Sequence, residues 1–85
     1  MFDNKKKNLT DFALLISKLD GASMIGLTRL LQVKVFYDDV KDENGKPMPR
    51  SGEAIIEDCL VKFNSLDRAK RRHILKILRA TKKEN

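Results

Sequence analysis

The fold of this 85-residue chain is decided by residues 65–83, which read SLDRAKRRHILKILRATKK. At about 100° per residue, apolar and small side chains fall on one side of a helix and cations on the other, so we predict an amphipathic helix ending near Thr81. Ser65 is expected to cap it, with Asp67 in the first turn, where a carboxylate favours the helix dipole. The predicted core side carries Leu66, Ala69, His73, Ile74, Ile77, Ala80 and Thr81. The predicted basic side carries Arg68, Arg71, Arg72, Lys76, Arg79, Lys82 and Lys83.

This helix holds the net charge of the whole chain. Residues 68–83 contain eight basic residues and no acidic one, while the full chain has 18 Lys and Arg, 12 Asp and Glu and a formal charge of +6. The remainder of the chain therefore sums to −2. A helix that needs only solubility usually mixes signs, because Glu–Lys pairs four residues apart stabilise it. The segregation predicts a surface for a polyanion or an acidic protein, although a solvated basic face gives the same pattern.

Three side chains of this helix depart from the simple division. Leu75 falls inside the basic arc, where we expect it to be exposed and to serve as an apolar anchor for a partner. Lys70 falls on the apolar side, where its stem can lie along the surface. His73 is expected to be structural, because catalysis would need a nucleophile and an orienting carboxylate beside it.

Three further helices are predicted from apolar periodicity, over about 9–19, 22–32 and 52–63. Together with the C-terminal helix they give a mainly all-α fold, with about four helices in two helical pairs joined by a long loop. The predicted core consists of Phe12, Ile16, Leu27, Leu31, Ile56, Leu60, Phe63, Ile74 and Ile77.

Local signals set the ends of these helices. Asn8 is expected to cap the first helix, and Asp20-Gly21 to break it, because glycine adopts the left-handed conformation readily. Ser51 is expected to cap the third helix, with Glu53 in its first turn. Gly26 is expected to allow a close approach between the second helix and the first.

The link between the helical pairs changes period. From Val33 onward apolar and polar residues alternate, and Asn44-Gly45 is a strong turn signal, so the chain allows a minor two-stranded ribbon over 33–48. Pro47 and Pro49 restrict such a strand to an edge, because neither has an amide hydrogen to donate.

Size and composition limit the organisation and the chemistry. We expect a flexible tail over 1–8, a single helical domain over 9–82 and a second tail over 83–85. One cysteine excludes an internal disulfide, and Cys59 is expected to be buried within the third helix. No phosphate-binding glycine loop, metal motif or membrane-spanning apolar run is present in the sequence, so we expect a non-enzymatic cytoplasmic protein without cofactor or metal.

Two further motifs in the sequence fit their known patterns only in part. The acidic residues near Asn44-Gly45 suggest a calcium loop, but with Gly45 at its sixth position the first ligand falls on Val40 and the twelfth on Ser51. Residues 22–28 resemble the turn of a helix-turn-helix, yet the helix that follows is apolar where base-reading side chains are needed.

The chain resembles small helical proteins carried by phages and mobile elements of Gram-positive bacteria. The resemblance covers most of the chain and is carried by MIGLTRLLQV at 24–33, KPMPR at 46–50, FNSLDRAKRR at 63–72 and ILKIL at 74–78. It implies a regulatory or host-modulating binding role and assigns no functional residue.

These observations predict a regulatory binding module that uses the basic C-terminal helix. The first prediction is nucleic-acid binding through the phosphates of a duplex. The alternatives are an adaptor or inhibitor of an acidic host or phage protein, and a self-associating protein that buries part of the helix in a homodimer. The aromatic residues are few and expected to be buried, which argues against stacking on single strands; they are Phe2, Phe12, Phe36, Tyr37 and Phe63.

Overall fold

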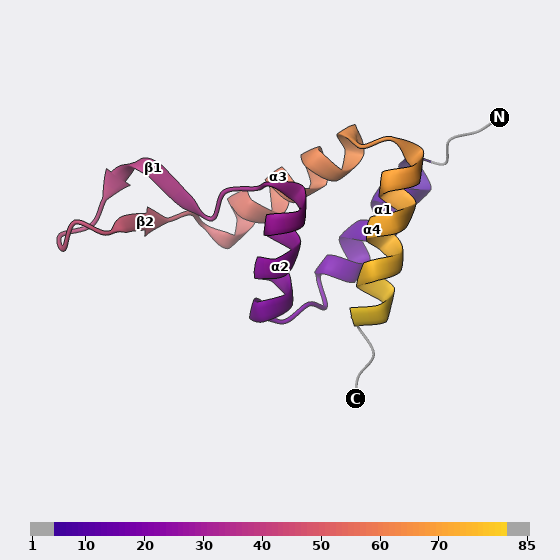
Figure 1. The fold of residues 1–85 in the computed structure, drawn as a ribbon, viewed down its shortest axis with the longest axis horizontal. Helices are drawn as coiled ribbons and strands as arrows, with labels where there is room; N and C mark the ends of the chain where they lie inside the picture. Colours follow the sequence, from indigo (N-terminus) through magenta and orange to yellow (C-terminus); the bar gives the residue numbers. More distant parts are fainter. Residues whose placement is uncertain (1–4, 82–85) are drawn as a thin grey trace.

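Four helices and one hairpin make up residues 5–81. The structure, a computed structural model, describes residues 5–81 (Figure 1). The predicted mainly helical fold and the minor ribbon are both confirmed. In chain order the elements are α1 Lys5–Ile16, α2 Gly21–Leu31, β1 Phe36–Lys41, β2 Pro47–Pro49, α3 Gly52–Ser65 and α4 Arg68–Thr81.

Short polar side chains cap the N-termini of α2 and α3. The predicted break of the first helix at Asp20-Gly21 is wrong, because α1 ends at Ile16 and Gly21 is the first residue of α2, without a left-handed φ. Asp20 caps α2 by accepting a hydrogen bond from the backbone N–H of Ser23 at 2.8 Å, and this bond lowers the pKa of the Asp20 carboxyl. Ser51 caps α3 by accepting from the N–H of Ala54 at 3.1 Å, which confirms the predicted cap. At its other end α2 stops at Gln32, which takes the left-handed conformation with φ of 59°.

Helix α1 is displaced from its predicted range. It begins at Lys5 and ends at Ile16, so Asn8 lies inside the helix and is not its cap, and residues 5–8 are helical rather than a loose tail. The ion pair between Lys7 and Asp11, at 3.4 Å, joins residues four apart and supports the extra turn. The rest of the predicted N-terminal tail and the tail at 83–85 lie outside the described residues.

A stacked pair of phenylalanines forms the centre of the core. Phe12 of α1 and Phe63 of α3 are fully buried, with ring centroids 4.1 Å apart and ring planes 7° from parallel. The prediction for Ile56 is wrong, because 39% of its surface is exposed, and Leu60 and Ile77 are only partly buried. The buried hydrophobic residues are Phe12, Ile16, Leu27, Leu31, Val33, Cys59, Phe63, Ile74, Leu75 and Leu78.

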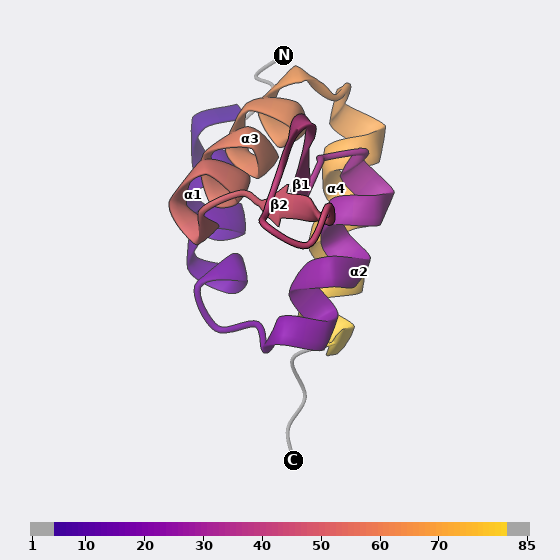
Figure 2. The same cartoon turned by 90° about the vertical axis from the view of Figure 1, so that its left-hand side faces the viewer.

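The helices pack mainly across the two halves of the chain. Helix α1 lies against α4 and α3, and α2 lies against α3, so the two sequential pairs share one core (Figure 2). Gly26 is exposed on α2, and no atom lies within 4 Å of the position that a Cβ would take. The predicted close approach at Gly26 is therefore wrong.

The hairpin projects from this helical body. Strands β1 and β2 pair antiparallel with an irregular register, and residues 36–49, called the arm below, extend away from the helices (Figure 1). The arm makes the molecule 52 Å long against 32 and 17 Å in the other directions. The radius of gyration of the molecule is 14.3 Å, whereas a compact domain of 85 residues has a radius of gyration of about 12 Å. The acidic segment of the arm forms a turn, in which the Asp42 carboxylate accepts from the N–H groups of Asn44 and Lys46.

Candidate cationic groove

The first turn of α4 is fixed by Asp67. Its carboxylate accepts a hydrogen bond from the N–H of Lys70 at 2.9 Å, in the manner of an N-cap. The predicted cap, Ser65, instead belongs to the end of α3, where its hydroxyl donates to the carbonyl of Lys62 at 2.7 Å. Helix α4 consequently begins at Arg68.

The core face of α4 differs from the predicted one. The buried residues are Arg71, Ile74, Leu75 and Leu78, whereas Ala69 and His73 are exposed. With 3.6 residues per turn, this places the true core face about a third of a turn from the predicted face. Leu75 has only 3% of its surface exposed, so the expectation of an exposed apolar anchor is wrong.

Arg71 is a structural residue, contrary to its predicted place on the basic surface. It has 1% of its surface exposed, and its Nη1 donates to the backbone carbonyl of Leu66 at 2.6 Å. This charge-assisted bond ties the connection between α3 and α4 to the first turns of α4. A partner in solution therefore has no access to the Arg71 side chain.

The remaining described cations of the predicted surface lie together. They are exposed and follow the spacing i, i+4, i+8 and i+11, which confines them to an arc of about 80° on the helix. Lys82 and Lys83 lie outside the described residues. The four cations of this stripe are Arg68, Arg72, Lys76 and Arg79.

This stripe forms one wall of an open groove of about 840 Å³ between α4 and α1. Lys7 adds a fifth cation from α1, and Asp11 is the one acidic residue among the described residues that line the groove. The Asp11 carboxylate lies 3.4 Å from Lys7 Nζ and 3.5 Å from Arg79 Nη2. The full lining consists of Lys7, Asn8, Asp11, Arg68, Ala69, Arg72, His73, Leu75, Lys76 and Arg79.

Sequence reasoning missed the contribution of α1 to the groove. Lys7 was assigned to a tail, although its spacing of four from Asp11 is a helical ion-pair signal. The groove also lacks an aromatic wall within the described residues, because its lining includes no Phe or Tyr.

The aromatic residues fall into two groups. Phe12 and Phe63 are buried as predicted. Phe36 and Tyr37 are 51% and 44% exposed on the arm, so the prediction that they are buried is wrong. Phe2 lies outside the described residues.

Cys59 lies in the core and away from the groove. It is fully buried, as predicted, and burial raises the pKa of its thiol, with a smaller contribution from the negative charge of Asp58. A buried thiol with a raised pKa carries little thiolate at neutral pH and reacts slowly.

The described residues hold neither a metal cluster nor a membrane-spanning helix. Between residues 5 and 81, no three His, Cys, Asp or Glu side chains cluster in a way that could hold a metal ion. No helix in this part of the chain has the length and apolar character needed to cross a membrane. A smaller cavity of about 210 Å³ lies between α2 and α4, and its lining within the described residues includes no charged residue. The groove is the larger of the two and the one that gathers charged side chains.

A scan against protein-family models and searches of curated proteins and of solved structures find no match for this chain. The resemblance to phage and mobile-element proteins thus stays a prediction.

Proposed function

We propose that this protein is a non-enzymatic module that binds duplex nucleic acid through the phosphate backbone, with the cationic groove as its contact surface. The observation that carries the proposal is the convergence of five exposed cations on one open groove whose described lining includes a single carboxylate. Cations placed on one surface bind a polyanion more strongly than the same cations dispersed, because they act on neighbouring phosphates together.

The dimensions of the stripe suit a run of phosphates. Arg68 and Arg79 are eleven residues apart, which is about 16 Å along an α-helix. Phosphates follow one another every 3.4 Å along the axis on one strand of a duplex, so the stripe spans about five of them.

The arrangement favours backbone contact over base readout. The major groove is about 12 Å wide and admits one helix of 10–12 Å diameter. Helix α4 packs against α1 along the cationic groove, so it does not stand free as a single helix that could enter alone. Contact restricted to phosphates gives little sequence preference.

A duplex is favoured over a single strand. Stacking of unpaired bases needs exposed aromatic rings next to the cations. The exposed Phe36 and Tyr37 lie on the arm, far from the groove (Figure 1).

The alternative partner is an acidic protein. The sequence predicts that Leu75 is the apolar residue that contacts such a protein, but Leu75 is buried and is not available for that contact. The same cations would serve either partner, so the experiment has to separate them.

The test is binding of two unrelated duplexes of equal length, measured by fluorescence anisotropy at low and at moderate salt. Arg72→Glu with Lys76→Glu reverses two exposed charges that take part in no ion pair within the described residues. The matched control, Lys18→Glu with Lys62→Glu, makes the same change in net charge at exposed positions outside the groove.

We expect the wild type and the control to bind both duplexes with similar affinity that falls steeply with salt, and the groove variant to lose binding. No binding by the wild type at low salt would overturn the proposal and leave the acidic protein as the partner to seek. Equal loss in the groove variant and the control would show that net charge, and not the groove, is responsible.

A further inference from the structure

The arm exposes apolar side chains that nothing in the described structure covers. Both strands are exposed along their full length, including Phe36, Tyr37, Val40 and Met48. An isolated two-stranded hairpin is at best marginally stable in water and gains stability by packing against another surface. Exposed apolar side chains that lie together often mark a surface that binds a partner, whereas isolated ones do not.

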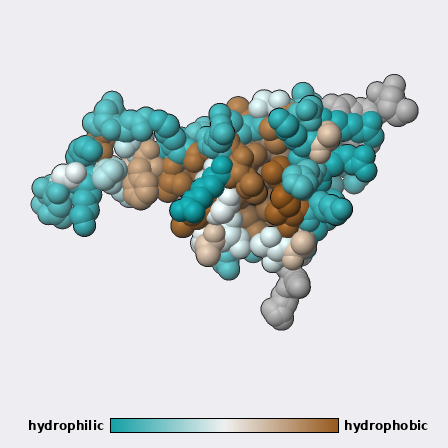
Figure 3. All heavy atoms as spheres, viewed as in Figure 1, coloured by the Kyte–Doolittle hydropathy of each residue, from teal (hydrophilic) through white to brown (hydrophobic). Residues whose placement is uncertain are grey.

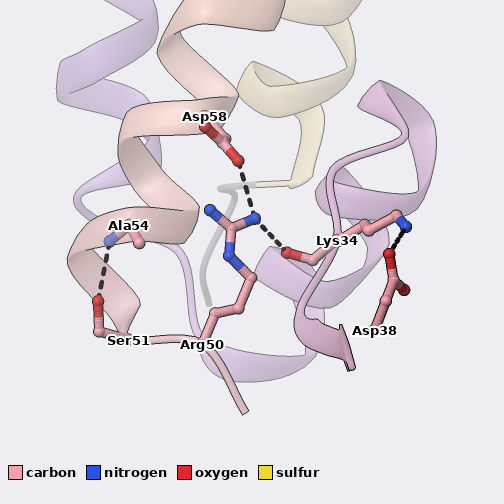
Figure 4. A network of polar contacts seen from close by, with 6 residues as sticks. All are labelled: Lys34, Asp38, Arg50, Ser51, Ala54 and Asp58. Carbon is pink, nitrogen blue, oxygen red and sulfur yellow. Dashed lines mark hydrogen bonds and ion pairs between the residues drawn. The ribbon is translucent and has the colours of Figure 1, made fainter. Parts of the chain in front are cut away.

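The base of the arm is fixed to the helical body by Arg50. Its Nη1 donates to the carbonyl of Lys34 at 2.9 Å and lies 2.8 Å from the carboxylate of Asp58 on α3 (Figure 4). The Arg50 N–H also donates to the carbonyl of Val35 at 2.8 Å. These three contacts hold the two ends of the arm together and direct the arm away from the helices.

The outer part of the arm is hydrophilic (Figure 3) and carries four carboxylates against two lysines, Lys41 and Lys46, so its net charge is negative. Two of its four carboxylates are engaged locally, because Asp38 pairs with Lys34 and Asp42 forms the turn. Asp39 and Glu43 are exposed and have no ion-pair or hydrogen-bond partner for their carboxylates within residues 5–81. The arm thus offers an apolar surface with free negative charge.

The cationic groove offers the complementary surface. Its rim carries Arg72 and Lys76, and between the cations its lining includes the exposed apolar Ala69. The arm and the groove lie at opposite ends of a molecule 52 Å long, so the arm of one chain does not reach its own groove (Figure 1).

We propose that the arm of one copy docks into the cationic groove of a second copy. Tyr37 supplies the apolar contact, and Asp39 and Glu43 approach the groove cations. The contact joins two different surfaces, so it is head-to-tail and leaves a free arm at one end and a free groove at the other. Such a contact builds open chains unless its rotation closes a ring.

This inference does not depend on nucleic-acid binding, although the two share the groove. A polyanion and the arm compete for the same cations, so the protein disassembles as it binds. Charge complementarity also makes the self-association weaker at high salt.

The test is sedimentation velocity over a wide concentration range, with three variants. The arm variant is Asp39→Lys with Glu43→Lys, the groove variant is Arg72→Glu with Lys76→Glu, and the third chain carries all four changes. Circular dichroism confirms that each variant retains the helix content of the wild type. If either reversal unfolds the chain, Asp39→Asn with Glu43→Gln and Arg72→Gln with Lys76→Gln replace it.

We expect the average mass of the wild type to rise with concentration and to fall with added salt. Each two-site variant should stay monomeric alone. An equimolar mixture of the neutral arm variant, Asp39→Asn with Glu43→Gln, and the neutral groove variant, Arg72→Gln with Lys76→Gln, should give a one-to-one dimer and nothing larger. The mixture contains one intact arm and one intact groove per pair, and the two neutral surfaces do not attract each other. The four-site chain should regain self-association, because both charges of the contact are reversed together.

A wild type that stays monomeric at every concentration would overturn the inference, and so would self-association that the arm variant retains. A mixture that remains monomeric would exclude the head-to-tail contact. Duplex binding by the arm variant is the separate readout: it is retained if the proposed function is right, whatever the outcome for self-association.

Discussion

The substitution Leu75→Ala tests where α4 faces, because the sequence pattern and the structure place this residue on opposite sides. Leu75 is 3% exposed and packs in the core. Truncation of a buried leucine to alanine costs about 2–5 kcal/mol, through lost burial and the cavity that remains. An 85-residue domain has roughly 4–13 kcal/mol of total stability, so this loss is a large share of it.

The matched control is Leu14→Ala in α1, since Leu14 is a helical leucine with 59% of its surface exposed. Exposed substitutions usually change stability by no more than about 0.5 kcal/mol. The free energy of unfolding of both variants is measured by urea unfolding followed by circular dichroism. In thermal unfolding, the Tm of a domain of this size falls by about 4–8 °C for each kcal/mol of stability lost. Equal destabilisation of the two variants would refute the assignment of Leu75 to the core and restore it as a surface anchor.

Three further predictions concern single positions. Asp11→Asn removes the carboxylate beside Lys7 and Arg79, so we expect tighter binding of duplex DNA at low salt, measured by anisotropy; unchanged or weaker binding would mean that Asp11 does not compete with phosphate. The raised pKa of the buried Cys59 thiol predicts that a thiol reagent labels it only after unfolding, and rapid labelling of the native protein would contradict this. It also predicts that the free energy of unfolding falls as the pH rises above about 8.5, because the unfolded state releases the thiol proton first. Phe63→Ala removes half of the stacked pair, so we expect the free energy of unfolding, measured in urea, to fall by about 3–5 kcal/mol. A smaller loss than for Leu75→Ala would contradict the placement of this pair at the centre of the core.

Features set by local chemistry were predictable from the sequence. Ser51 starts α3, and Asn44-Gly45 marks the turn of the hairpin. In each case the signal depends on side-chain capping or on the left-handed backbone, and both act within a few residues.

The orientation of α4 was not predictable in the same way. A charge-based pattern assigns every arginine to solvent, yet Arg71 is buried with its guanidinium bonded to the carbonyl of Leu66. Periodicity fixes which residues share a face and leaves open which face is covered, because coverage depends on how α1 and α3 pack around the helix. The same limitation hid the contribution of Lys7 and Asp11 to the groove.

The salt dependence of duplex binding tests the central claim most directly. The logarithm of the affinity constant plotted against the logarithm of the salt concentration gives a slope of about −0.9 for each phosphate neutralised. Lys76→Ala removes one groove cation, and Lys62→Ala removes an exposed cation of α3 outside the groove lining. We predict that Lys76→Ala makes the slope shallower by about one unit and that Lys62→Ala leaves it unchanged; a slope that neither substitution changes, or that both change equally, would contradict phosphate binding in the groove.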